Sequence, residues 1–204
     1  MNLTALQQDA LVEVINIGFG RAAASLSKLT GQRVHLEVPQ ITMCPLDELS
    51  EHLRPMVQNE VASIHQIFSG SVAGDALLVL DEHSAAILKE LLTNEPAMPL
   101  QMDASAREVL TEVGNILLNA CLGSFGNLLH VQVSFSVPHL TLETLEGVVS
   151  SVTVNREGLR YALIVHAAFR LKNSSLTGYL IIVLSVASIE RLIRAIEQWE
   201  GGER

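Results

Sequence analysis

The chain has 204 residues, of which 49% are hydrophobic and 17% charged, and this is enough apolar material for one globular domain with a substantial core. Its formal net charge of −9 and the lack of a local basic patch exclude a nucleic acid or an anionic membrane surface as the partner, because both would repel it. We therefore expect a single domain over residues 1–204 that binds neither.

No stretch of the sequence has the features of a targeting segment. The N-terminal MNLTALQQDALVEV contains acidic residues and lacks the basic start of a signal peptide, and the longest apolar run, GYLIIVLSVA, is too short to span a bilayer. Cys44 and Cys121 each stand alone in apolar surroundings, without the spacing of a metal site or a redox pair, and are interpreted as buried thiols. These features predict a cytoplasmic protein with no membrane insertion and no metal site.

The first predicted helix begins near Thr4 and ends near Gly31. The sequence TALQ fits a Thr-x-x-Gln capping box, and glycine is the residue that most often follows a helix C-terminus. RVHLEV then alternates apolar and polar residues, which is typical of a half-buried strand, and it runs into Pro39. A short helical connection, a hairpin and a helix over HSAAILKELL complete the first half of the chain.

The same order of elements recurs 99 residues further along the chain. In this register EVINIGFG (13–20) aligns with EVGNILLN (112–119), and both halves continue to a Val-Pro pair. After a short insertion, IHQIFSG (64–70) aligns with VHAAFRL (165–171). We predict an α+β fold with an internal duplication, related by a pseudo-two-fold axis, in which each half of about 1–99 and 100–204 has a long helix, strands and a closing helix.

Each long helix carries a glutamate and an asparagine three residues apart, Glu13 with Asn16 and Glu112 with Asn115. Residues three apart share a helix face, and the apolar stripe of each helix lies on another side, so both pairs are expected to face outward. Asparagine is a poor helix former and a helix core has no use for a carboxamide. A solvated surface is the alternative for one such pair, but its recurrence in register favours a functional site.

Two further acidic residues and two prolines accompany these pairs. Asp9 lies one turn before Glu13 and extends the polar face, and Glu108 takes the matching place in the second half. Glu108 also fits a capping box, SARE, in which Ser105 is the N-cap, so the second helix is expected to begin at either Asp103 or Ser105. The prolines, Pro39 and Pro138, are interpreted as structural residues that end the strand beside each helix.

This spacing resembles the signature of the CheC/CheX/FliY family of chemotaxis phosphatases: Asp or Ser, three residues, Glu, two residues, Asn, twenty-two residues, Pro. The first half matches it in full, whereas Glu108 stands where the family has Asp or Ser. NIGFGRAAASLSKLTG (16–31) is similar to the family's NIGAGHAATALS, with Phe19 and Arg21 as departures. A chain with two intact sites and without an appended motor domain is most similar to the CheC members of this family.

The resemblance implies a phosphatase that removes the phosphoryl group from the aspartate of a CheY-like response regulator. It implies that Asn16 and Asn115 orient the attacking water, that Glu13 and Glu112 pair with a lysine of the receiver, and that Asp9 supports docking. A glutamate acting as general base is less favoured, because an exposed carboxylate is a weak base at neutral pH. No cofactor of its own is expected, since the receiver supplies the Mg²⁺.

Two other functions stay open at this point. The chain is also compatible with a regulatory module that binds a receiver or a CheD-like deamidase with little catalysis, and with a flagellar-switch-type scaffold. The intact pair of carboxamides favours the enzyme, because a scaffold would not need asparagine at both positions. GFGRAAAS lies inside a predicted helix, so its small residues are interpreted as a close contact with a neighbouring backbone and not as a phosphate-binding loop.

Overall fold

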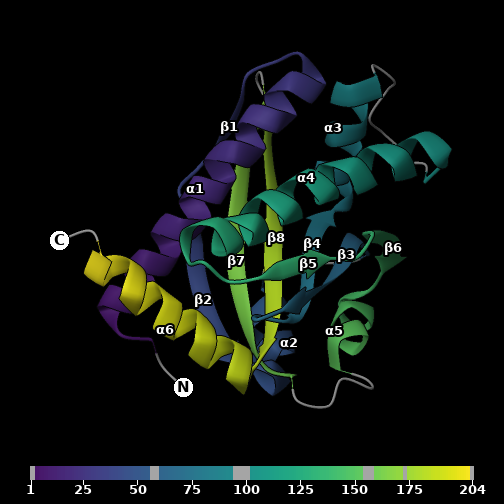
Figure 1. The fold of residues 1–204 in the computed structure, drawn as a ribbon. Helices are drawn as coiled ribbons and strands as arrows, with labels where there is room; N and C mark the ends of the chain where they lie inside the picture. Colours follow the sequence, from purple (N-terminus) through teal and green to yellow (C-terminus); the bar gives the residue numbers. More distant parts are fainter. Residues whose placement is uncertain (1–2, 56–59, 94–101, 154–158, 172–173, 203–204) are drawn as a thin grey trace.

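The computed structural model describes residues 3–55, 60–93, 102–153, 159–171 and 174–202 (Figure 1). The first half contains α1 (Ala5–Thr30), β1 (Val34–Leu36), β2 (Gln40–Pro45), the 3-10 helix η1 (Leu46–Glu48), α2 (Leu49–Leu53), β3 (Val61–Gly70), β4 (Gly74–Asp81) and α3 (Glu82–Thr93). The second half contains α4 (Ala104–Leu128), β5 (Val133–Phe135), β6 (His139–Glu143), α5 (Leu145–Thr153), β7 (Leu159–Leu171), β8 (Ser174–Ser185) and α6 (Val186–Gly202). The predicted α+β class and the repeated order of elements are confirmed. The predicted boundary at 99/100 lies outside the described residues.

The eight described strands form one antiparallel sheet in which the two halves exchange strands. The main path is β1-β7-β8-β4-β3-β5, with β2 also paired to β7 and β6 also paired to β3. The strands β1 and β2 of the first half therefore pair with the second half, and β5 and β6 of the second half pair with the first. Neither half holds a complete sheet by itself, and we infer that the two halves fold together.

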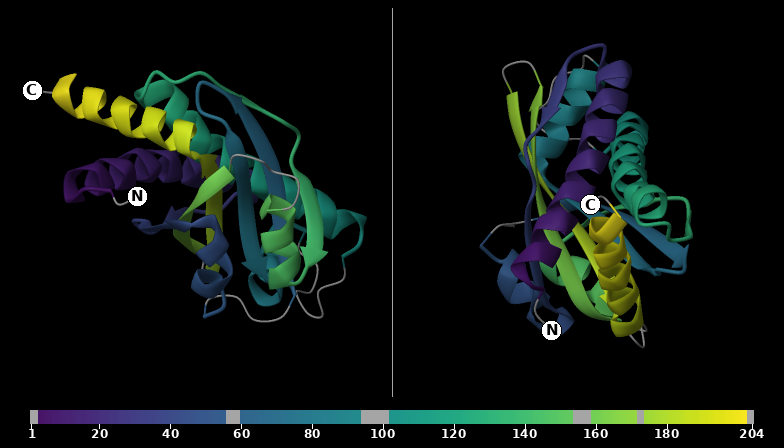
Figure 2. Two further views of the ribbon diagram at one scale, coloured as in Figure 1. Left: turned by 90° about the horizontal axis from the view of Figure 1, so that it is seen from below. Right: turned by 60° about the vertical axis from the view of Figure 1, so that its left-hand side comes forward.

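Helices cover both faces of this sheet (Figures 1 and 2). The larger core lies between the sheet and α1, α3, α4 and α6, and the smaller core lies between the sheet and α2 and α5. Alternate strand residues serve the two cores: Ile64 and Leu78 belong to the larger one, and Leu77 and Val79 to the smaller. Burial on both faces explains why the central strands read as nearly continuous apolar runs.

The two long helices cross in direct contact over the sheet, because one of them lacks a side chain at the crossing. A Cβ atom on Gly18 would lie 2.9 Å from the Cα atom of Cys121 and 3.0 Å from the carbonyl oxygen of Ala120. The expected close approach of a neighbouring backbone is thus confirmed.

By length and composition α4 is apolar enough to cross a membrane, but half of that stretch is buried against its neighbours, so it is a core helix of this fold.

The boundaries of α1 agree with the capping signals in the sequence. The Thr4 hydroxyl accepts a hydrogen bond from the Gln7 amide at 3.2 Å, and the Gln7 side-chain oxygen accepts one from the Thr4 amide at 2.9 Å. Gly31 ends the helix with a φ of +65°, a conformation that favours glycine. Both predicted ends of α1 are therefore confirmed.

The start of α4 decides between the two N-caps that the sequence allowed. The Asp103 side chain accepts a hydrogen bond from the Ala106 amide at 2.8 Å and lies 2.9 Å from the Lys89 ammonium, so it is the N-cap. The alternative cap at Ser105 is wrong, because Asp103 gains the Lys89 contact and Ser105 already lies in the first turn. Glu108 consequently takes no part in a capping box.

The Asp103 cap predicts a pH-dependent contribution to stability. Hydrogen bonds from the Ala106 amide and the Lys89 ammonium lower the pKa of this carboxyl from its ordinary value of 3.8. A lowered folded-state pKa stabilises the protein above the unfolded value, and this stabilisation is lost as the pH falls through the folded value. We expect Asp103→Ala to lower the thermal midpoint at pH 7, with a difference that shrinks below pH 3.8. Equal midpoints at pH 7 would contradict this role, and Asp103→Ser, which keeps only the cap, serves as the intermediate control.

Candidate active sites on the two long helices

The predicted polar residues lie at equivalent places on α1 and α4. Glu13 and Glu112 are exposed, and Asn16 and Asn115 are half-buried. The acidic residues one turn earlier, Asp9 and Glu108, are exposed as well. Valines that follow each glutamate, Val14 and Val113, are completely buried in the larger core and hold each helix in a fixed rotation. Each helix therefore presents a carboxylate at the surface beside a carboxamide that is partly enclosed.

Each Glu/Asn pair lies on its own long helix, next to a short strand of its own half of the chain. The strand β1 packs beside α1 and lies at one end of the sheet path, whereas β5 packs beside α4 and lies at the other end. Each pair is therefore accompanied by the strand connection of its own half, which contains Pro39 or Pro138. Pro39 is buried and Pro138 is half-buried. The chain thus carries two separate candidate sites.

Each candidate site also has an exposed apolar residue that the sequence reasoning did not select. Val38 and Val137 directly precede the two prolines and are 67% and 86% exposed. An exposed valine at both equivalent positions offers a partner apolar surface next to the charged helix face. The internal repeat contained the signal, because valine precedes proline in both halves.

The carboxamide of Asn115 belongs to a chain of hydrogen bonds that reaches the sheet. Its Oδ1 atom accepts from Asn119 Nδ2 at 2.6 Å, and Asn119 Oδ1 accepts from Gln66 Nε2 at 3.2 Å. Gln66 Nε2 also donates to the backbone carbonyl of Ser136 at 2.8 Å. We call this chain, from Asn115 through Asn119 and Gln66 to Ser136, the amide relay.

Space for a partner group exists beside Asn115. A cleft of about 430 Å³ between the two long helices is lined by Asn115 and Asn119 of α4 and by Arg21 and Ser25 of α1. An anionic group entering this cleft would meet the Arg21 guanidinium and amide N–H donors. The same cleft would admit the water that a hydrolytic reaction needs.

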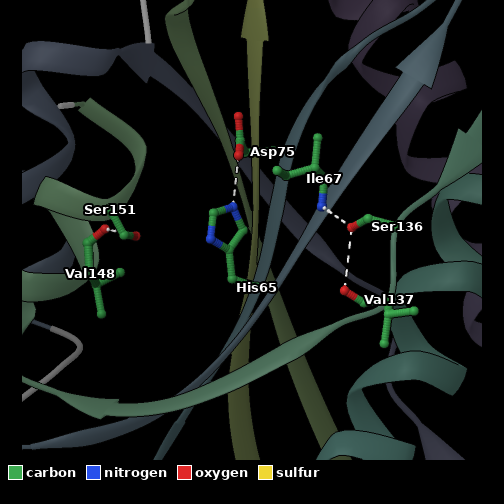
Figure 3. A network of polar contacts seen from close by, with 7 residues as sticks. All are labelled: His65, Ile67, Asp75, Ser136, Val137, Val148 and Ser151. Atoms are coloured by element: carbon green, nitrogen blue, oxygen red, sulfur yellow. Dashed lines mark hydrogen bonds and ion pairs between the residues drawn. The ribbon is translucent and has the colours of Figure 1, made fainter. Parts of the chain in front are cut away.

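Other titratable groups lie away from these sites. On the α2/α5 face of the sheet, His65 Nε2 lies 2.7 Å from Asp75 Oδ1 (Figure 3). The thiols of Cys44 and Cys121 are buried and free, as predicted, and burial raises the pKa of both, to about 11 for Cys44. Within the described part of the chain, no group of three or more His, Cys, Asp or Glu side chains is arranged to hold a metal ion.

Comparisons with known proteins show which family the chain belongs to. The model of the CheC-like family matches residues 6–43, a stretch that contains the complete first motif from Asp9 to Pro39. The CheY-P phosphatase CheC of Bacillus subtilis (strain 168) is 30% identical over 147 residues, covering 71% of this chain and 70% of that protein. This chain belongs to the CheC-like family. The flagellar motor switch phosphatase FliY of the same organism is 27% identical over 146 residues, which cover 69% of this chain but only 37% of FliY.

Solved structures show that the CheC-like fold is shared. Thermotoga maritima FliY superimposes with a TM-score of 0.79 at 20% identity, covering 98% of this chain and all of that one. CheX in a complex with CheY, BeF₃ and Mg²⁺ from Borrelia burgdorferi gives a TM-score of 0.51 at 18% identity, covering 84% of this chain and 98% of that one. These similarities confirm the mixed helix and antiparallel-sheet fold of this CheC-like protein.

Proposed function

We propose that this CheC-like protein hydrolyses the aspartyl phosphate of a CheY-like response regulator at two sites, centred on Asn16 and Asn115. The observation that carries the proposal is the recurrence of a surface glutamate and a partly enclosed asparagine at equivalent places on α1 and α4. The proposal is supported by the relative of the same family that is named a CheY-P phosphatase, and by the fold shared with a CheX that was solved with CheY.

The phosphatase contributes mainly by positioning the attacking water, because the receiver supplies the other catalytic groups. The oxygen of a water molecule attacks the phosphorus, and the bond from phosphorus to the aspartyl oxygen breaks, which leaves a carboxylate on the receiver and inorganic phosphate. The receiver's Mg²⁺ and lysine stabilise the charge, so the protein needs no cofactor of its own. A carboxamide accepts through Oδ1 and donates through Nδ2, and it therefore holds the water in line without changing protonation state.

The neighbouring residues then serve docking. The exposed carboxylates Glu13 and Glu112 form ion pairs with the receiver's lysine and fix its orientation, and Asp9 and Glu108 add negative charge one turn away. Pro39 and Pro138 hold the strand connection beside each helix, where the preceding valine contacts the receiver surface. A polar anchor with an exposed apolar edge is a usual composition for a transient interface.

The decay of a radiolabelled aspartyl phosphate on a CheY-type receiver in Mg²⁺ buffer tests the proposal. We expect substoichiometric amounts of the protein to accelerate the decay, because one molecule turns over many receivers. If the receiver binds but its aspartyl phosphate decays at the intrinsic rate, the protein is not the proposed phosphatase. The alternative of a receiver-binding module would then hold. Binding to a CheD-like deamidase, measured separately by calorimetry, stays a prediction that this assay does not address.

A further inference from the structure

We infer that Asn119 and Gln66 are positioning residues that fix the orientation of the Asn115 carboxamide in the second site. This inference rests on the proposed function for its effect on rate, but the orientation itself is measurable without any activity. Asn119 lies one helical turn after Asn115 on the same face of α4, and Gln66 comes from β3 beneath it.

The relay begins at an anchored group. Ser136 is attached to β3 by two hydrogen bonds. Its amide donates to the Ile67 carbonyl at 2.9 Å. Its hydroxyl accepts from the Ile67 amide at 3.0 Å, and Figure 3 shows this second contact. Its backbone carbonyl is an acceptor only, so the side-chain nitrogen of Gln66 must point toward it. The direction of the first amide is thereby determined.

This direction passes from one amide to the next. Since Gln66 presents its nitrogen, Asn119 must turn its oxygen toward Gln66 and its nitrogen toward Asn115. Asn115 then accepts through one lone pair of Oδ1, so the second lone pair and both Nδ2–H donors stay available to a water molecule or a phosphoryl group in the cleft. In the flipped carboxamide, the oxygen of Asn115 would take the place of Nδ2, and its lone pair would repel a phosphoryl group in the cleft. The relay therefore selects the productive one of the two carboxamide orientations.

A purely structural role for Gln66 does not account for the details of its contacts. Gln66 is 1% exposed, and its Oε1 atom is buried without a hydrogen-bond partner among the described residues. Leaving a buried acceptor unpaired is destabilising, and an apolar residue would avoid it. The equivalent position in the second half, on β7, holds an alanine, Ala167, which is buried in the larger core.

The first site lacks the relay. Gly20 stands at the position equivalent to Asn119, and the Asn16 side chain makes no hydrogen bond within the described part of the chain. The two sites therefore differ in how their asparagines are held, although the asparagines themselves are equivalent. This difference allows each site to serve as the internal control of the other.

Kinetics in single-site backgrounds test the inference. In the Asn16→Ala background, where only the second site works, Asn119→Ala should lower kcat about three- to tenfold, the equivalent of one net hydrogen bond, and leave KM within about twofold. In the Asn115→Ala background, where only the first site works, the same change should have no effect. An equal loss in both backgrounds would overturn the inference in favour of a general effect on folding. No loss in either would overturn it as well.

An isosteric change separates orientation from packing. Asn119→Asp keeps the size of the side chain but presents only acceptor oxygens, so it should draw Nδ2 of Asn115 toward itself and lower kcat at least as much as alanine does. If Asn119→Asp behaved like the wild type, the relay would not act through polarity. Asn127→Ala is the matched control, because Asn127 lines the same cleft on the same helix and belongs to no part of the relay.

The side-chain NH₂ resonances give a readout that does not need a phosphatase. In the ¹⁵N-labelled protein we expect the Asn119 NH₂ protons to exchange with solvent more slowly than those of Asn127, because they donate to Asn115. Gln66→Ala should remove this protection. If the protection is seen but neither single-site background has activity, the proposed function fails and the relay stands. If the Asn119 protons are unprotected but both sites are active, the relay fails and the proposed function stands.

Discussion

Dephosphorylation of the receiver should fall to its intrinsic rate in the Asn16→Ala/Asn115→Ala double variant. Each change removes the carboxamide that we propose holds the attacking water, and misplacing a reactant by about 1 Å costs on the order of 10²-fold in rate. The two side chains are partly exposed at helix surfaces, so their truncation leaves no large cavity and the fold should be retained. The measurement is the radiolabel decay of the receiver, with circular dichroism as the check of folding.

The single variants distinguish the two sites. Each should retain part of the activity, because each site has its own Glu/Asn pair on its own long helix. Only Asn115 is held by the amide relay, and we therefore expect Asn115→Ala to lose the larger share. Binding of the receiver should persist in the double variant, since Glu13 and Glu112 stay in place. A folded double variant that still accelerates the decay would refute the assignment of the asparagines.

The repeat allowed the sequence to predict the order of the elements and the equivalence of the two sites. Local sequence signals were sufficient to predict the two ends of α1, because the contacts of Thr4 with Gln7 and the conformation of Gly31 are local. They were insufficient at the start of α4, because the choice of Asp103 over Ser105 involves Lys89 from α3. A contact made across the fold leaves no periodic signal in the sequence.

Non-local contacts explain the other features that were not predicted. The exchange of β1 and β2 onto β7 pairs residues more than a hundred positions apart, and alternation within a strand specifies its faces but not its partner. The relay joins Gln66 to Asn119 and Ser136, and each of these residues on its own reads as an ordinary polar residue of a strand, helix or loop. The Glu/Asn motif was visible in the sequence because it is local and occurs twice.

Gly18→Ala and Gly20→Ala should change stability in opposite directions, although the two glycines lie two residues apart in α1. Alanine is favoured over glycine in a helix interior by about 1 kcal/mol, and this gain applies to both positions. A Cβ atom on Gly20 has no atom within 4 Å, so the gain is realised in full. We expect a rise of roughly 2–4 °C in the thermal midpoint of Gly20→Ala, as a chain of this size shows for 1 kcal/mol.

At Gly18 the same methyl group meets the backbone of α4, 2.9 Å from Cys121 Cα and 3.0 Å from the Ala120 carbonyl oxygen. Backbone atoms have no alternative rotamer, so α1 and α4 must separate, and overpacking of this kind costs about 1–3 kcal/mol. This cost exceeds the helix-propensity gain, and the midpoint of Gly18→Ala should fall below that of the wild type in differential scanning calorimetry. A midpoint equal to that of Gly20→Ala would show that the helices do not meet at Gly18. Because α4 carries Asn115 and Asn119, the separation should also lengthen the contact of Asn119 with Gln66 and lower kcat in the Asn16→Ala background.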